Sequence, residues 1–285
     1  MVGLLPWLAQ AANHFRLNTS AAMQAKLNFL LTATSFMTFN VATVPIDCLS
    51  SSATLEHLVS CLDVYTVQDS FYTAATYASA QPTAAQAAAW SSAVSSLMNV
   101  GNGGYTCADA STTISAGNAL DGIYQIASFR DDVTLASYCM LVESTVNDAG
   151  SYAKGWGFVI VPVTHAASSG VHLSAPHPVH DSGTAKQASA LFKSISARSL
   201  LVSGRSRAAY AASTTCVVPS KGSYYKTDSA HDNEQPFLAA SVALFNAQMV
   251  EGGCPTTTCA FVQLHGKANT TCSKDSMFMS AGIGE

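Results

Sequence analysis

Charged residues are scarce in this chain. They make up 11% of its 285 residues, against roughly 25% in an average soluble domain. The 13 Lys and Arg residues are outnumbered by 17 Asp and Glu residues, so the formal net charge is −4. Proteins that bind phosphate backbones carry clustered basic residues. The composition therefore argues against nucleic acid as a partner.

Two sequence motifs are also missing. No C-x-x-C pair occurs, which argues against a zinc ribbon, and no G-x-S-x-G elbow occurs, which argues against a serine hydrolase. The stretch "GRSR" (204–207) beside several histidines could hold a phosphate, but a compact arginine-histidine phosphatase signature is absent. A serine hydrolase and a phosphatase therefore remain alternatives without a supporting motif.

The N-terminal region contains a pattern typical of export. Residues 1–45 form the predicted leader, with Met23 as the start of translation and an apolar run from Leu27 to Ala42 as the signal-peptide core. This run contains Asn and several Thr and is too short for a typical transmembrane span. The alternative interpretation is a helix of the protein core. The first interpretation predicts a secreted, extracellular protein without stable membrane association after the leader is removed.

The cysteines agree with export, since an even number of them follows the leader. Four disulfides would use all eight in an oxidising compartment. Local pairing is expected between Cys48 and Cys61, and between Cys259 and either Cys254 or Cys272. A sequon at Asn269 could carry a glycan. The eight residues are Cys48, Cys61, Cys107, Cys139, Cys216, Cys254, Cys259 and Cys272.

The predicted domain, residues 46–285, is a single compact unit with two kinds of pattern. Apolar residues recur at helical spacing in 46–150, including the alanine-rich stretch 82–100, and further helices are expected around 115–128 and 131–146. The first part is therefore predicted to be a largely helical layer.

Residues 151–285 instead alternate between strand and helix patterns. Buried strands are expected at 155–163 and 197–204 and a third strand at 259–266, with helices around 188–195 and 236–249. Alternation with short connections favours an α/β fold with a mostly parallel or mixed sheet and flanking helices. Ligands of such sheets bind beyond the carboxyl ends of the strands.

Several histidines lie at such strand ends. "HLSAPHPVHDSGT" (172–184) follows a strand-like stretch and precedes a helix, and His265 ends the last predicted strand. His177 and Asp181 are four residues apart on the strand-to-helix turn, so with His265 they could form the two-His, one-carboxylate set of a hydrolytic zinc site. Gly183 would permit the tight turn, Ser182 or Thr184 would cap the helix, and Thr184 could also support the site. The alternative is that Asp181 is itself only a helix-start carboxylate.

The series "HPVHDSGTAKQASALF", then a strand ending in Gly204, then "DSAHD" and "VQLHG", resembles the order found in poly-γ-glutamate hydrolases and their zinc-carboxypeptidase-like relatives. The resemblance covers residues 177–266. It implies His177, Asp181 and His265 as zinc ligands and places His231 in the cleft. The chain departs from the family in having Asp rather than Glu, at an interval one residue shorter.

Further site residues are predicted around this set. His180 is a candidate for supporting the ligands. Arg205 and Arg207 follow a strand end, where Arg205 could act in catalysis and Arg207 could bind a substrate carboxylate bidentately. His231, flanked by acidic residues, suits acid-base work, and Glu234 is a candidate base because Glu285 is the only glutamate after His265.

The leading hypothesis is a secreted zinc-dependent hydrolase that cleaves an amide bond in a small-molecule or polymer substrate of peptide-like or γ-linked type. The main alternative from another class is a secreted, disulfide-stabilised binding protein without catalysis. The sequence leaves the oligomeric state open.

Overall fold

The computed structural model describes residues 45–164, 170–217, 222–268, 270, 273–275, 277, 279 and 280. The chain divides into two units, Met1–Ala42 and Thr43–Glu285, and every described residue belongs to the second. Residues 1–44 of the predicted leader therefore lie outside the described residues, as do His165, Asn269, Cys272 and Glu285.

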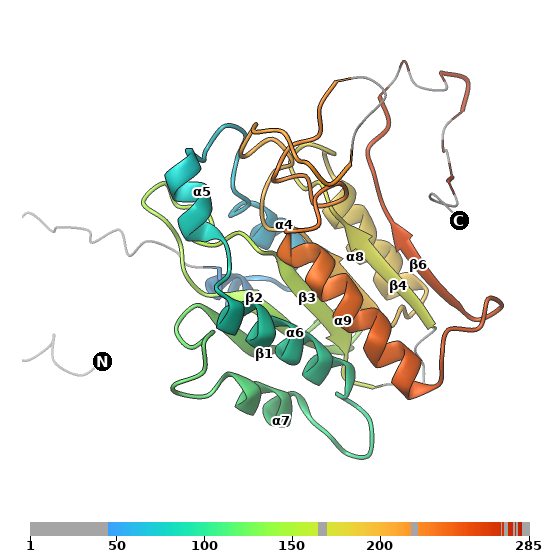
Figure 1. Cartoon of the computed structure of the whole chain (residues 1–285). Helices are drawn as coiled ribbons and strands as arrows, with labels where there is room; N and C mark the ends of the chain where they lie inside the picture. The colour runs from blue at the N-terminus through green and yellow to red at the C-terminus, as the bar shows by residue number, and fades with distance from the viewer. Residues whose placement is uncertain are drawn as a thin grey trace, which may run out of the picture. The chain divides into compact units, whose positions relative to one another are not determined.

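The second unit is built on one mixed sheet of six strands (Figure 1). The strands are β1 (Tyr124–Arg130), β2 (Ser137–Glu143), β3 (Phe158–Pro162), β4 (Gly170–Ala175), β5 (Ser199–Val202) and β6 (Cys259–Gln263). Their order is β1-β2-β3-β5-β4-β6. The three pairings on the β1 side are antiparallel, whereas β4 runs parallel to both β5 and β6. The α/β prediction is confirmed. The sheet is mixed rather than mostly parallel, because β3 is antiparallel to β5.

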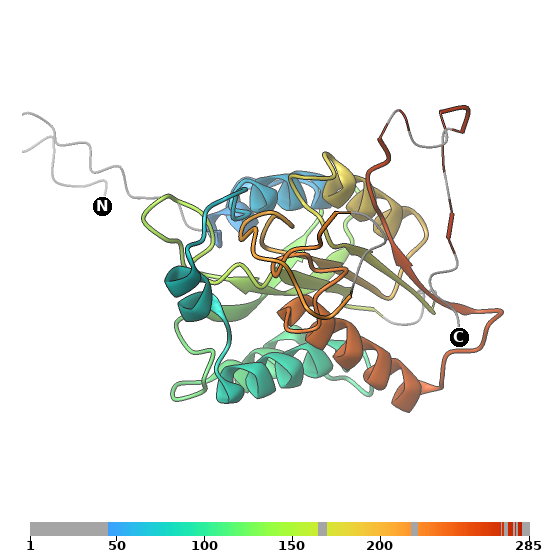
Figure 2. The same ribbon diagram turned by 45° about the horizontal axis from the view of Figure 1, so that its top comes forward.

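Helices cover both faces of the sheet. They are α3 (Asp47–Ser51), α4 (Leu55–Asp63), α5 (Ala74–Ala80), α6 (Ala84–Met98), α7 (Cys107–Ser111), the 3₁₀ helix η1 (Thr112–Ile114), α8 (Thr184–Ser194) and α9 (Pro236–Glu251). In Figure 2, α4 and α8 lie on one side of the sheet, and α6 and α9 lie on the other. Each strand alternates its side chains between the two faces. Met140 accordingly packs with the α4 and α8 side, and Cys139 and Leu141 pack with the α6 and α9 side.

The prediction of a helical layer through residue 150 is wrong in its second part. The expected helices at 115–128 and 131–146 are replaced by the antiparallel hairpin of β1 and β2. The last six residues of β2 are all buried, so an apolar run covered on both faces of a sheet had the appearance of a helix pattern. Asp131 does not begin a helix. Its carboxylate accepts N–H bonds from Val133, Thr134 and Leu55 at 2.8–3.0 Å and so fixes the hairpin turn.

The elements predicted for the second half are confirmed, with one difference on α9. The residues Leu238, Val242, Phe245 and Met249 carried the helical pattern in the sequence, yet they face solvent. The side that packs on the sheet is made by Phe237, Ala240, Ala243 and Leu244. This helix is apolar on nearly its whole surface, so the sequence pattern could not identify its buried side.

Three disulfides join elements within the described part of the chain. Cys48–Cys61 links α3 to α4, Cys107–Cys139 links α7 to β2, and Cys254–Cys259 closes the connection between α9 and β6. The expected local pairs are therefore present, while Cys216 is a free, exposed thiol. Three disulfides are consistent with an extracellular protein. Among the described residues, no helix has the length and apolar character needed to cross a membrane.

Candidate metal centre

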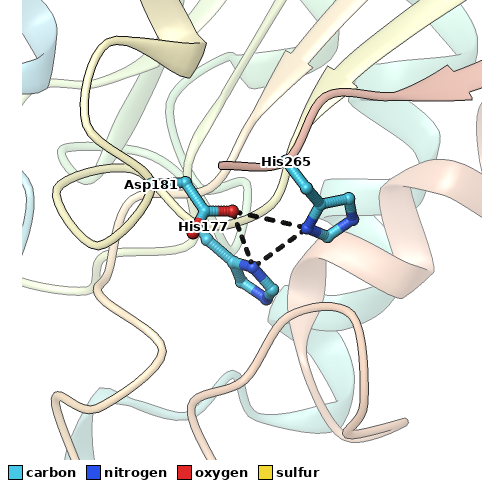
Figure 3. A group of neighbouring side chains, drawn as sticks. All are labelled: His177, Asp181 and His265. Carbon is cyan, nitrogen blue, oxygen red and sulfur yellow. Dashed lines mark hydrogen bonds and ion pairs between the residues drawn. The ribbon is translucent and has the colours of Figure 1, made fainter. Parts of the chain in front are cut away.

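The parallel part of the sheet brings His177, Asp181 and His265 together. Because β4 and β6 are parallel neighbours, their carboxyl ends lie at the same edge, and His177 and His265 each follow two residues after such an end. Figure 3 shows the three side chains converging. Nδ1 of His177 lies 3.2 Å from both Nδ1 of His265 and Oδ2 of Asp181, and Nδ1 of His265 lies 3.4 Å from that oxygen.

These separations fit a tetrahedral zinc ion. Bonds of about 2.0–2.1 Å place tetrahedral ligand atoms roughly 3.3–3.4 Å apart. His177 is buried at 1% exposure, Asp181 is also buried, and the His265 side chain is 40% exposed. The three residues therefore offer three ligand atoms of suitable chemistry, with the exposed side of His265 open to a substrate or water.

The turn before α8 directs the Asp181 carboxylate to this centre. Gly183 takes the N-cap position with φ of +80°, a conformation that favours glycine, and no side chain caps the helix. Neither Ser182 nor Thr184 caps free N–H groups, contrary to the prediction. The Thr184 hydroxyl instead donates to the backbone carbonyl of Asp181 at 2.7 Å. Since it does not cap α8, the Asp181 carboxylate is available to the centre.

A second buried carboxylate, Asp228, orients His177 from the other side. Its Oδ1 accepts from Nε2 of His177 at 2.9 Å and from Nδ1 of His231 at 2.8 Å, and its Oδ2 accepts from Nη2 of Arg207 at 2.5 Å. A proton on Nε2 of His177 leaves the lone pair of Nδ1 directed at Asp181 and His265. The carboxylate thus fixes the tautomer that a ligating histidine requires.

The sequence interpretation missed this role, because it treated Asp228 only as one of the acids that flank His231. Asp228 lies 51 positions after His177, and only the folded loop between β5 and α9 brings them together. His177, Asp228 and His231 also form a second set with metal-ligand chemistry. The hydrogen bonds from His177 and His231 to Asp228 are 2.9 and 2.8 Å long, shorter than the spacing of roughly 3.3–3.4 Å between two ligands of one zinc ion. These bonds account for the arrangement without an ion.

His177, Asp181, Asp228 and His265 form a cluster whose electrostatics favour ionised carboxylates. Burial raises the pKa of Asp181 and of Asp228, but hydrogen bonds from His177, together with His265 for Asp181 and His231 for Asp228, outweigh burial and hold both pKa values well below the usual range. Burial lowers the pKa of His177, yet the bonds to Asp181 and Asp228 bring its pKa above the ordinary value. In the metal-free protein a proton on Nδ1 of His177 can therefore hold the place that a cation would take.

His231 and Arg207 lie beside the cluster, as predicted. The imidazole of His231 stacks on Tyr224 with ring centroids 3.7 Å apart. Its Nδ1 donates to Asp228, so in the neutral ring Nε2 carries the lone pair. Arg207 uses one nitrogen for Asp228 and its side chain is 24% exposed. The two residues thus offer a proton acceptor and a cationic donor next to the three ligands.

Three other predicted residues lie away from the ligand atoms. Arg205 is buried, donates to the carbonyls of Gly155 and Lys154 at 2.9 and 2.6 Å, and supports the segment before β3 rather than catalysis. The Glu234 side chain is 63% exposed and lies 3.6 Å from Lys226 Nζ. The His180 side chain is exposed and makes no hydrogen bond or ion pair within the described residues. Within the described residues none of the three side chains forms a hydrogen bond or ion pair with His177, Asp181 or His265, and their roles as catalytic groups and supporting residue stay predictions.

Gly266 provides a direct test of the ligand geometry. A Cβ at this position would come within 3.1–3.2 Å of Asp181, and a backbone hydrogen bond from Gly266 contributes to the low pKa of that carboxyl. The substitution Gly266→Ala is expected to displace Asp181 from His265 and to weaken zinc binding by roughly 10-fold. Isothermal titration with zinc measures this effect. Gly252→Ala is the control, because a Cβ there meets no atom. Equal affinities in the two variants would contradict the assigned position of Asp181.

Comparison of the chain with protein-family models, curated proteins and solved structures finds no match. The functional argument therefore depends on the site itself. The site consists of a His/Asp group at the carboxyl edge of the mixed sheet, and this group could hold a metal ion.

Proposed function

We propose that this protein is a secreted zinc-dependent hydrolase that cleaves an amide bond. The observation that carries the proposal is the convergence of His177 Nδ1, Asp181 Oδ2 and His265 Nδ1 at tetrahedral ligand spacing. Two histidines, one carboxylate and an open side are the ligand set of hydrolytic rather than structural zinc sites. When bound, zinc supplies a Lewis acid that polarises a carbonyl and lowers the pKa of water.

The chain's own residues perform the remaining tasks in this proposal. Asp228 holds His177 in the ligating tautomer through the 2.9 Å bond to Nε2. His231 accepts a proton at Nε2, and its Nδ1 is held by Asp228 at 2.8 Å. This histidine, which the sequence predicts to suit acid-base work, takes the role of general base. The side chain of Asp232, another nearby acid, instead accepts from the Thr214 hydroxyl at 2.6 Å.

The proposed substrate carries a carboxylate near the scissile amide. Arg207 supports this because its guanidinium is partly exposed beside the cluster and has nitrogens beyond the one that contacts Asp228. The choice of an amide, in a peptide-like or γ-linked small molecule or polymer, follows the resemblance of residues 177–266 to poly-γ-glutamate hydrolases. Secretion is supported by the three disulfides and by the export pattern of the leader.

Metal analysis and ligand substitution test the proposal. The purified protein is expected to bind one zinc ion, and His177→Ala or His265→Ala is expected to lower zinc affinity more than about 100-fold. His180→Ala is the matched control, since this histidine is exposed and outside the cluster. Peptide and γ-glutamyl amides are then assayed with and without a chelator.

The outcomes separate the two leading functions. Zinc-dependent turnover that is lost in both ligand variants supports the hydrolase. Zinc binding that is lost in both variants, without turnover of any amide by the native protein, would favour the metal-binding protein without catalysis. Unchanged zinc content in His177→Ala and His265→Ala would contradict the proposed metal centre and with it the hydrolase.

A further inference from the structure

The outer surface of α9 carries a stripe of large apolar side chains that are exposed to solvent. Leu238, Val242, Phe245 and Met249 are 40–49% exposed. Phe261 on the edge strand β6 is also partly exposed and contacts Phe245, with ring centroids 5.7 Å apart. The stripe therefore continues from the helix onto the edge of the sheet. A contiguous apolar surface of this kind commonly marks an interaction site.

The spacing of the stripe indicates which partner fits. Its four residues follow one another at intervals of four, three and four positions, which is the seam along which two helices pack with side chains interdigitated. The series reads the same in both directions. An identical helix laid antiparallel across a two-fold axis would therefore place Leu238 against Met249 of the partner subunit and Val242 against Phe245 of the partner subunit.

Charge and shape agree with a self-complementary contact. Glu251 is the only charged residue of α9, it stands at the end of the helix, and it pairs with Arg198. The strand β6 has no charged residue. A second copy would thus meet neither repulsion nor a buried unpaired charge along the stripe. A groove lined by Ser91 and Ser95 of α6 and by Leu238 and Val242 borders the stripe and offers space for a partner's side chains.

We propose that two copies of this chain associate through α9, packed antiparallel about a two-fold axis, with Phe261 of β6 extending the contact. The interface is isologous, because the same surface serves both subunits. It lies on the α6 and α9 face of the sheet (Figure 2). The proposal is independent of metal binding and of catalysis.

Sedimentation of variants that introduce charges into the stripe tests the proposal. The native protein is expected to sediment as a dimer in the micromolar range. The acidic variant Val242→Glu/Phe245→Glu and the basic variant Val242→Lys/Phe245→Lys are each expected to be monomers, because like charges would face each other across the axis. Mixed together they are expected to form a heterodimer, since opposite charges then meet. Val64→Glu, at the C-cap of α4 where the side chain is 75% exposed, is the control and should remain a dimer.

Hydrogen exchange of the native protein gives a second measurement that needs no variant. Peptides covering α9 should exchange more slowly at high than at low protein concentration, while those covering the β1–β2 hairpin should not change. A native monomer would overturn the proposal, including one whose apolar stripe binds neutral phosphatidylcholine vesicles. Dimers that persist in both charged variants, or α9 exchange independent of concentration, would overturn it as well.

Discussion

Replacing Asp228 by alanine is expected to lower both the stability of the protein and its zinc affinity substantially. The carboxylate is fully buried and accepts hydrogen bonds from His177, His231 and Arg207. Its removal leaves a guanidinium and two imidazole N–H groups without their acceptor. Breaking such a buried ionic group by deleting one partner typically costs about 3–5 kcal/mol in the free energy of unfolding. Losing the residue that orients a ligand lowers metal affinity about 10–100-fold.

Two further variants isolate these effects. Asp228→Asn keeps the side-chain shape and one acceptor oxygen, so it should fall between the native protein and Asp228→Ala in both quantities. Asp232→Ala removes a nearby buried acid that bonds to Thr214 and to the Glu234 N–H. This control should cost about 1 kcal/mol and leave zinc affinity unchanged.

Urea unfolding in the presence of a chelator gives the stability of the metal-free protein, and competition with a chelating dye gives the zinc affinity. Native zinc affinity in Asp228→Ala would show that His177 does not need this partner. In that case Asp228 would have only a structural role.

The second large effect concerns stability against pH, where two buried groups are expected to oppose each other. Burial raises the pKa of Glu143 from 4.5 to about 7, against hydrogen bonds from the Lys154 and Gly155 N–H groups and from Tyr124 and the nearby charge of Arg205. Burial lowers the pKa of His172 from 6.5 to about 4, although the bond to Gln248 acts in the other direction. Arg198 also lowers this pKa and Glu251 raises it.

The direction in which each group changes stability with pH depends on which of its protonation states the folded protein stabilises. The folded protein holds the proton of Glu143 more tightly than the unfolded chain does. The stability from this group is therefore complete below pH 4.5 and is lost as the pH rises to about 7. The folded protein disfavours protonated His172, so stability is lost as the pH falls from 6.5 to about 4. Each contribution is roughly 3 kcal/mol, and between pH 4.5 and 6.5 they nearly offset each other.

Single substitutions should reveal the pH dependence of stability that each group contributes. In Glu143→Gln, stability should increase by roughly 3 kcal/mol as the pH rises from 4 to 6.5, because His172 still titrates and Glu143 no longer opposes it. In His172→Gln, stability should decrease by a similar amount between pH 4.5 and 7. The measurement is urea unfolding of metal-free protein across this range, with Glu234→Gln as an exposed control. Parallel curves for all four proteins would show that neither group titrates in this window.

The position of the candidate site could be predicted from the sequence, because it depends on local order. His177 and His265 each follow an apolar strand, and the carboxyl ends of parallel strands meet at one edge. The antiparallel pairing of β3 with β5 could not be predicted in the same way. It is decided by long-range contacts between strands that are more than thirty residues apart.

The errors arise where the apolar pattern does not mark a single buried face, or where the partner of a side chain comes from a distant segment. β2 is apolar because both of its faces are covered, so its pattern lacks the alternation that identifies a half-exposed strand. The helix α9 presents apolar residues toward the sheet and toward solvent alike. Asp228 and Arg205 are charged residues whose partners come from distant segments. Sequence spacing alone could not assign either of them to its place.

The edge position of β6 has a consequence for how fast an ion held at this centre could leave. β6 pairs with β4 on one side only within the described sheet, and strands with few neighbours open locally more readily than the core does. His265 follows directly after β6, so fraying of this strand would withdraw one of the three ligands. The exchange rate of the ion should then equal the local opening rate of the strand. The lifetime of the bound metal would thus report the dynamics of the sheet edge.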